Sequence, residues 1–152
     1  MFPDPRLRHW KGHDILHFSF SDSITKYQVN NATMYVYVRG TERRPAPVFT
    51  LDVFKVYKYD SPGTVKVASK KMSQPTGHGA WVKVDVTAVV SEWFKSAKDN
   101  VGIVLNGTVD GRRVLVTERA GDGGKKVSAL NADVDDVQQL ATRYVFGHNI
   151  DE

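Results

Sequence analysis

One segment, WVKVDVTAVVSEWF at residues 81–94, changes its hydrophobic period half-way along. Its first half alternates valine with lysine or aspartate, which is the two-residue repeat of a strand with one buried face. From Val86 onward the apolar positions follow helical spacing, since Val89 and Trp93 share one stripe with it. The segment therefore predicts a strand that runs directly into a short helix, which we place at residues 86–98.

The residues on either side of this helix fit its expected ends. Asp85 and Thr87 belong to the residue types that accept hydrogen bonds from the unpaired N–H groups of a first helical turn. Downstream, Asp99 and Asn100 end the helical pattern, and the sequence VGIVL that follows begins another strand. The whole unit is therefore expected to be strand, helix and strand.

The rest of the chain predicts short strands separated by turn residues. They are expected near residues 14–20, 31–39, 48–59, 64–72, 101–106 and 112–118. Asp110-Gly111 is a strong signal for a hairpin between the last two. Toward the end of the chain, residues 134–144 carry a helical stripe and residues 142–147 a strand pattern, so we expect a helix followed by a strand. The fold class is all-β, an antiparallel two-sheet sandwich with one clear helix.

Composition and charge narrow the class of protein. The 152 residues are 41% hydrophobic and 25% charged, which is ordinary for one globular domain. No apolar run is long enough to insert into a bilayer. The net charge of +4 is spread over small basic clusters such as Arg43-Arg44 and Lys70-Lys71. Such pairs are usual on a soluble surface, and the sharper alternative is a sulfated polysaccharide or another anionic extracellular partner. Nucleic acid is not expected, because no recognised binding motif accompanies the charge.

No constellation of catalytic or metal-binding residues stands out. His13 and His17 are four residues apart, but in an extended segment that places them about 13 Å apart, too far to chelate one ion. Asp85 and Glu92 could form an acid pair, yet Asp85 has a role at the helix start and Glu92 falls on the polar face of the helix. The chain has no cysteine, which rules out disulfides, thiolate metal sites and cysteine nucleophiles within it. We therefore expect no enzyme and no cofactor.

The strand–helix–strand unit also resembles a known family. WVKVDVTAVVSEWFK followed by NVGIVL is similar to the signature of the propeptide of transforming-growth-factor-β superfamily precursors. Upstream, ILHFSF (15–20), NATMYVYVR (31–39) and FTLDVFKVY (49–57) resemble the first strands of that family's arm domain, in the same order, and the LHF start looks most like the activin branch. The resemblance covers residues 13–120. The residues that carry its signature are Trp81, Asp85, Thr87, Trp93 and Gly102.

This resemblance implies a secreted, extracellular and non-catalytic prodomain. It implies a jelly-roll-like arm domain at residues 13–147, followed by a tail at 148–152, while residues 1–12, with two prolines and no periodicity, are expected to be an extended segment. Such a prodomain assists folding and dimerisation of a cystine-knot growth factor and stays bound to the mature dimer, in some members keeping it latent or tethering it to the extracellular matrix. The contact in the family is sheet extension by the first and last strands. Carried over by strand position, the binding edge consists of Ile15, Leu16, Phe18, Phe20, Tyr144 and Phe146.

Two sequons bear on secretion, and one rival functional class with the same fold stays open. Asn31-Ala32-Thr33 and Asn106-Gly107-Thr108 are glycan acceptors in a secreted chain where the asparagine is exposed. Jelly-roll modules of secreted microbial surface proteins, which bind carbohydrate or act as structural repeats, also carry a strand, a DVT helix start and an N-x-G block. A sheet face lined with exposed aromatic residues favours this rival, whereas an unpaired edge at residues 15–20 favours the prodomain.

Overall fold

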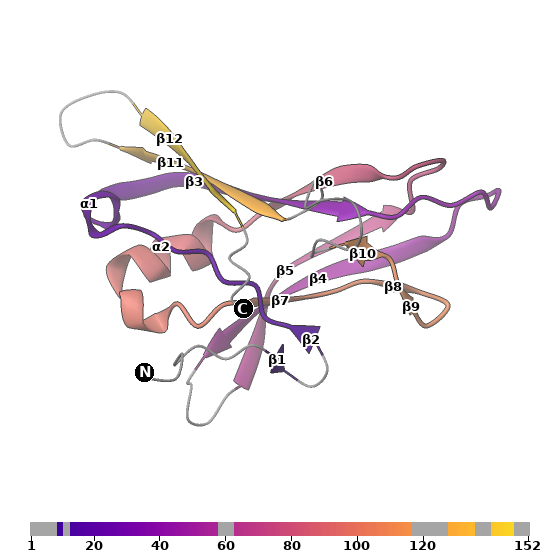
Figure 1. Ribbon diagram of the computed structural model, residues 1–152, viewed down its shortest axis with the longest axis horizontal. Helices are drawn as coiled ribbons and strands as arrows, with labels where there is room; N and C mark the ends of the chain where they lie inside the picture. The colour runs from indigo at the N-terminus through magenta and orange to yellow at the C-terminus, as the bar shows by residue number, and fades with distance from the viewer. Residues whose placement is uncertain (1–8, 11–12, 58–62, 117–127, 136–140, 148–152) are drawn as a thin grey trace, which may run out of the picture.

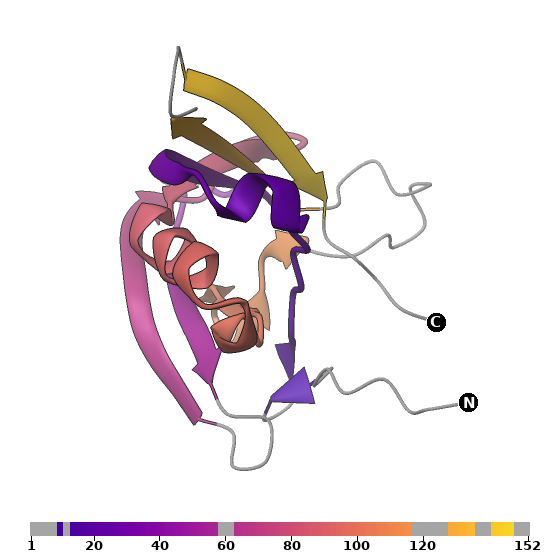
Figure 2. The ribbon, with the colours of Figure 1, turned by 90° about the vertical axis from the view of Figure 1, so that its left-hand side faces the viewer.

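The computed structural model describes residues 9–10, 13–57, 63–116, 128–135 and 141–147. Most of these residues form two antiparallel sheets that face each other, with helices near one end (Figure 1). Figure 2 shows the sheets as separate layers, with helix α2 enclosed between them. The expected all-β sandwich is therefore confirmed. None of the helices in the described ranges is long and apolar enough to cross a membrane.

The helical elements are α1 (Asp22–Thr25), α2 (Thr87–Lys95) and a 3-10 turn, η1 (Ala97–Asp99). The strands are β1 (His9–Trp10), β2 (His13–Asp14), β3 (Gln28–Val38), β4 (Val48–Tyr57), β5 (Gly63–Ser73), β6 (Ala80–Asp85), β7 (Ile103–Asn106), β8 (Thr108–Val109), β9 (Arg112–Arg113), β10 (Leu115–Val116), β11 (Ala129–Asp135) and β12 (Ala141–Gly147).

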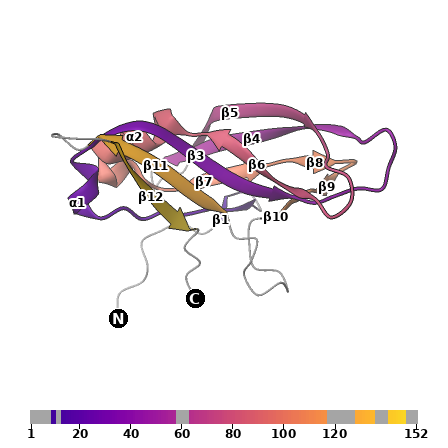
Figure 3. The ribbon, with the colours of Figure 1, turned by 90° about the horizontal axis from the view of Figure 1, so that it is seen from above.

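Strand β3 is the centre of a five-stranded sheet. One side of β3 pairs with β6, and the other side pairs with β10 and β11 at successive positions along the strand. Beyond β11 lies β12, at the margin of the sheet (Figure 3). The register between β3 and β11 shifts at Asn30, which is an extra residue in β3 and therefore a β-bulge.

The second sheet has three strands in the order β5, β4 and β7. The chain before α1 lies beside β7 and is joined to it by a single bridge, in which Leu16 and Ile103 exchange both main-chain hydrogen bonds at 2.8 and 3.0 Å. The hairpin signal at Asp110-Gly111 is confirmed. Both residues have positive φ, 51° and 78°, and they join β8 to β9 as the two-residue turn that such a pair favours.

The main hydrophobic core lies between the two sheets. Alternate residues of β4 point into it, namely Phe49, Leu51 and Val53, and Val82 and Val84 of β6 face them from the other sheet. Each of these strands has one buried face, as the two-residue hydrophobic repeat predicts. Burying a side chain of this size contributes about 1.5–3 kcal/mol relative to leaving it in water.

Helix α2 closes one end of this core. Its buried residues are Val89, Val90, Trp93 and Phe94, which lie on one helical stripe. Trp93 is only 1% exposed, and its ring packs against Phe20, whose ring also contacts Phe94. The helix expected at residues 86–98 is therefore present, although Ser96 has an extended backbone that separates α2 from η1.

Two predictions about secondary structure were wrong. The strand expected at residues 14–20 is reduced to β2 and the bridge at Leu16, and the chain then enters α1, which the sequence did not predict. The helix expected from residue 134 is replaced by strand at both of its ends, because Val134 and Asp135 belong to β11 and residues 141–144 belong to β12, whereas residues 136–140 lie outside the described residues. Seven residues of β11 pair with β3, and these main-chain hydrogen bonds outweigh a local helical stripe. The strand expected at residues 142–147 is confirmed.

Two other expectations fall wholly or largely outside the described residues. They are the extended segment at residues 1–12, of which only residues 9–10 are described, and the tail at residues 148–152.

Candidate functional site

The junction between β6 and α2 is held by a hydrogen-bond network around Thr87. The Thr87 hydroxyl donates to the Asp85 carboxylate at 2.6 Å, and the Thr87 main-chain N–H donates to the same oxygen at 2.9 Å. The main-chain N–H of Ala32, on β3, donates to the Thr87 hydroxyl oxygen at 3.0 Å. Asp85 therefore satisfies the first N–H of the helix, while Thr87 ties the helix start to the central strand.

Both hydrogen bonds from Thr87, the hydroxyl first and the N–H second, lower the pKa of Asp85 below its ordinary value. Because the folded pKa is the lower one, the stabilisation is complete above the unfolded pKa of about 4 and is lost as pH falls below it. We expect Asp85→Asn to flatten the acid side of the pH dependence of stability, measured as the urea midpoint. Thr87→Val removes the hydroxyl donor, which has the largest effect on the Asp85 pKa, and keeps the carboxylate. It should therefore flatten the acid side of the pH dependence only partially. An unchanged acid limb in both variants would contradict this role for Asp85.

A second network holds the start of the domain against the N-x-G block. The Asn100 side-chain amide donates to the main-chain oxygen of Phe18 at 2.8 Å. Gly102 has φ of 115°, and its main-chain oxygen accepts the N–H of Val56 at 3.0 Å. A Cβ at Gly102 would overlap the Ile15 side chain and lie 2.9 Å from the Leu16 oxygen. The glycine is therefore required for close approach of the two segments.

The signature tryptophans occupy different environments. Trp93 lies in the core, and its indole N–H has no hydrogen-bond partner among the described residues. Trp81 is 46% exposed and packs its ring edge-on against Tyr37, with 5.4 Å between ring centroids. Tyr35, two residues before Tyr37 in β3, is half-buried and accepts a hydrogen bond from Asn131 at 3.2 Å. Tyr35, Tyr37 and Trp81 therefore follow β3 and β6 on one face of the sheet.

The residues expected to form the binding edge near the start of the chain are mostly buried. Leu16 and Phe18 belong to the main core, and Phe20 packs against it. Ile15 belongs to a smaller cluster on the other face of β7, with Val56, Val101 and Val104. Substituting these side chains would therefore destabilise the core, and any loss of binding could not be assigned to an interface. At the other end of the chain, Tyr144 and Phe146 lie in β12, opposite Ala132 and Leu130.

The two sequons also differ in their environment. Asn31 lies in β3 with an exposed side chain, and its amide oxygen is 3.4 Å from the Thr87 hydroxyl. Asn106 is half-buried at the end of β7 and is followed by Gly107, which is buried against Leu115. Exposure of the asparagine therefore favours Asn31 as the glycan acceptor.

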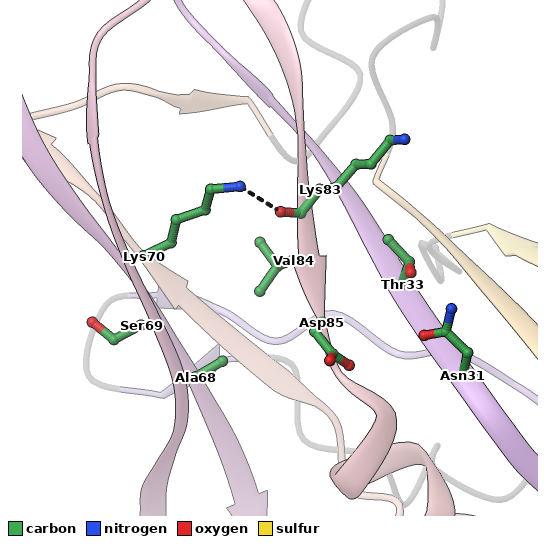
Figure 4. Close-up of a pocket in the computed structure, with 8 residues that line it drawn as sticks. All are labelled: Asn31, Thr33, Ala68, Ser69, Lys70, Lys83, Val84 and Asp85. Atoms are coloured by element: carbon green, nitrogen blue, oxygen red, sulfur yellow. Dashed lines mark hydrogen bonds between the residues drawn. The ribbon is translucent and has the colours of Figure 1, made fainter.

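A groove of about 440 Å³ lies between β5 and β6 (Figure 4). We call it the β5–β6 groove. It is lined by Asn31, Thr33, Ala68, Ser69, Lys70, Lys83, Val84 and Asp85. Lys70 reaches across from β5 and donates to the main-chain oxygen of Lys83 on β6 at 3.1 Å, which links the two sheets on this side.

Asp85 and Glu92, which the sequence suggested as an acid pair, each interact with a different residue and not with each other. Asp85 is engaged by Thr87, whereas Glu92 forms an ion pair with Lys55 of β4 at 2.7 Å. Within the ranges that the structure describes, no three His, Asp or Glu side chains gather as they would around a metal ion. His17 is buried, and the side chain of His13 lies outside the described set.

Comparison with known families adds the deciding observation to this geometry. A family model described as the TGF-beta propeptide matches residues 1–130. The chain belongs to the TGF-beta propeptide family. It is therefore a prodomain of a growth-factor precursor, and the family is one of secreted, generally non-catalytic propeptides that associate with the mature growth factor. Among the two classes considered from the sequence, this match favours the propeptide over the microbial surface module.

Within this TGF-beta propeptide, the structure explains why separate parts of the signature occur together. The ILHF segment and the N-x-G block are far apart in the sequence, yet Asn100, Gly102 and Ile103 hold Leu16 and Phe18 directly. Sequence reasoning identified both parts and missed the contact. It also missed the link from Asn31 and Ala32 to Thr87, because nothing in a local pattern indicates a partner 55 residues away.

Proposed function

We propose that this chain is the arm domain of the prodomain of a secreted, activin-like growth-factor precursor, and that it binds the mature growth-factor dimer and assists its folding and dimerisation. The observation that carries the proposal is the TGF-beta propeptide match over residues 1–130. The LHF sequence at residues 16–18 supports the activin branch. Binding through this chain is non-covalent, because its sequence contains no cysteine.

The edge of β12 is the part of the domain best suited to sheet extension. Among the described residues, β12 pairs only with β11, so its other side is available for main-chain hydrogen bonds to an added strand. The strand includes Tyr144 and Phe146, which the family resemblance had marked. The segment from Ile15 to Phe20 contributes main-chain groups beside β7 rather than side chains, since Ile15, Leu16 and Phe18 are buried.

Two further properties support an extracellular setting. Asn31 is an exposed sequon asparagine, and we propose that it carries a glycan in the secreted chain. The lysines Lys66, Lys70 and Lys71 are exposed along β5, which favours binding of a sulfated polysaccharide as a second, charge-driven interaction. Such binding would weaken with increasing salt.

The test uses proline to remove main-chain donors from β12. In an antiparallel pair, the N–H groups of successive residues point to opposite sides of the strand. Of Tyr144→Pro and Val145→Pro, one therefore removes a hydrogen bond to β11 and the other removes a donor on the outer side. We expect the variant that lacks the outer donor to keep the wild-type unfolding temperature and to lose capture of a mature activin-like dimer. Capture is measured by pull-down from conditioned medium of growth-factor-secreting cells.

The matched control is Val67→Pro in β5, at the extra residue where the β4–β5 register shifts. That substitution is at a bulge on a different sheet edge and should leave capture unchanged. Capture by both β12 variants at the wild-type level, with both folded, would contradict binding through this edge. Absence of any growth-factor capture by the folded wild-type chain would contradict the proposed function as a whole.

A further inference from the structure

Two sheet edges face each other across the β5–β6 groove. Within the described ranges, β5 pairs only with β4, and β6 pairs only with β3. Lys70 of β5 donates a hydrogen bond to the main-chain oxygen of Lys83 on β6 across the groove between these two edges. Strands whose outer main-chain groups are unpaired are templates for pairing with another chain, and so for aggregation.

The longer of these edges is only partly protected. β5 runs from Gly63 to Ser73 and carries Lys66, Lys70 and Lys71, a residue type that discourages strand pairing at an edge. However, Val65 and Val67 on the same strand are 46% and 38% exposed. Apolar β-branched side chains on a free edge favour association, so some further cover would reduce the risk.

Asn31 is placed to supply that cover. Its side chain lines the groove together with Lys70 and Asp85, whose ammonium and carboxylate groups can hydrogen-bond to a sugar in addition to their contacts with Lys83 and Thr87 (Figure 4). The Asn31 oxygen lies near the Thr87 hydroxyl, while its Nδ2 has no hydrogen-bond partner among the described residues. Attachment of a glycan uses only Nδ2, so the contact of the oxygen with Thr87 can persist.

We propose that Asn31 carries an N-linked glycan whose first sugars occupy the β5–β6 groove and prevent strand pairing at β5 and β6. This inference rests on the secretion that the proposed function includes. The glycan comes from a lipid-pyrophosphate-linked oligosaccharide. A bond forms between Nδ2 and the anomeric carbon of the first N-acetylglucosamine, the bond from that carbon to the pyrophosphate breaks, and Nδ2 loses one proton.

The test secretes the whole chain from cultured animal cells and identifies the modified asparagine by peptide mass spectrometry. Thr33→Ala removes the sequon, and Thr33→Ser removes the same methyl group but keeps the sequon. We expect wild type and Thr33→Ser to carry the glycan and stay monomeric on concentration. Thr33→Ala should lack it and aggregate several-fold faster, measured by light scattering at equal unfolding temperature.

Two additional samples separate the role of the first sugar from that of glycosylation in general. Trimming the wild-type glycan to a single N-acetylglucosamine should preserve most of the protection, because that sugar is attached to Asn31 and is the first to enter the groove. Adding Val67→Lys to Thr33→Ala should restore solubility, since a charge on β5 replaces the cover. Thr108→Ala, which removes the Asn106 sequon, should behave as wild type.

An unmodified Asn31 in the secreted chain would overturn the inference, as would a glycan-free chain that aggregates no faster than the modified one. Neither result bears on growth-factor capture, which is measured separately with the β12 variants. Failure of capture with Asn31 fully modified would instead count against the proposed function alone.

Discussion

Gly102→Ala is expected to destabilise the domain by about 2–6 kcal/mol, the sum of a strained backbone and an overpacked contact. The φ of Gly102 is 115°, which residues with a Cβ rarely adopt, and the added carbon would overlap the Ile15 side chain and crowd the Leu16 oxygen. The free energy of unfolding from urea titration measures the loss.

Gly111→Ala is the matched control for this variant. Gly111 also has positive φ, 78°, but a Cβ there would meet no atom within 4 Å. It therefore reports the backbone cost alone, about 1–3 kcal/mol. Equal losses of unfolding free energy in the two variants would show that Gly102 is not required for the close approach of residues 15–17. The close-approach explanation of the glycine in the N-x-G block would then be wrong.

Trp93→Ala is expected to cost about 3–5 kcal/mol, because it leaves a large cavity at the end of the core. Trp93 is 1% exposed on α2 and contacts Phe20. The unfolding midpoint in urea or by heating measures the effect, and binding of a small apolar dye would report loosened packing.

The control is Trp81→Ala, on the neighbouring strand β6. Trp81 is 46% exposed and packs its ring against Tyr37, so its removal should cost much less. A near-neutral result for Trp93→Ala, or a larger loss for Trp81→Ala, would contradict the assignment of Trp93 to the core.

The parts of the fold that sequence predicted are those with a clear local period. Periodicity places the alternating valines of β6 and the helical stripe through Val89 and Trp93 correctly. Each of these elements buries one face in the core, so its buried residues recur with the period of the strand or of the helix. The turn at Asp110-Gly111 was equally local, since positive φ is a property of those two residues.

The parts that failed depend on distant partners. Ile15 and Leu16 are adjacent and both buried, because they belong to separate clusters on the two faces of β7, and this pattern is neither helical nor alternating. At the other end, Val134 has a helical context but pairs with Val29. Residues 134–135 are strand because they pair with β3, and no local sequence pattern indicates that β3 has a side available for that pairing.

The candidate site divides in the same way. Asp85 and Thr87 were identified by residue type at a helix start, and the hydrogen bonds between them are local. Their connection to Ala32 and Asn31 on β3, and the β5–β6 groove beside them, arise only when the two sheets come together. Those features therefore required the three-dimensional arrangement.

The pairing of β3 has a consequence for the order in which the chain can fold. One side of β3 pairs with β6, but most of the other side needs β11, whose Ala129 pairs with Tyr35 from far along the sequence. Contacts of such separation slow folding, so this domain belongs among proteins that fold in milliseconds to seconds rather than microseconds. On the ribosome, residues 28–35 of β3 lack their β11 partner until residues 129–135 have emerged, which until then leaves that side of the central strand available to chaperones or to other chains.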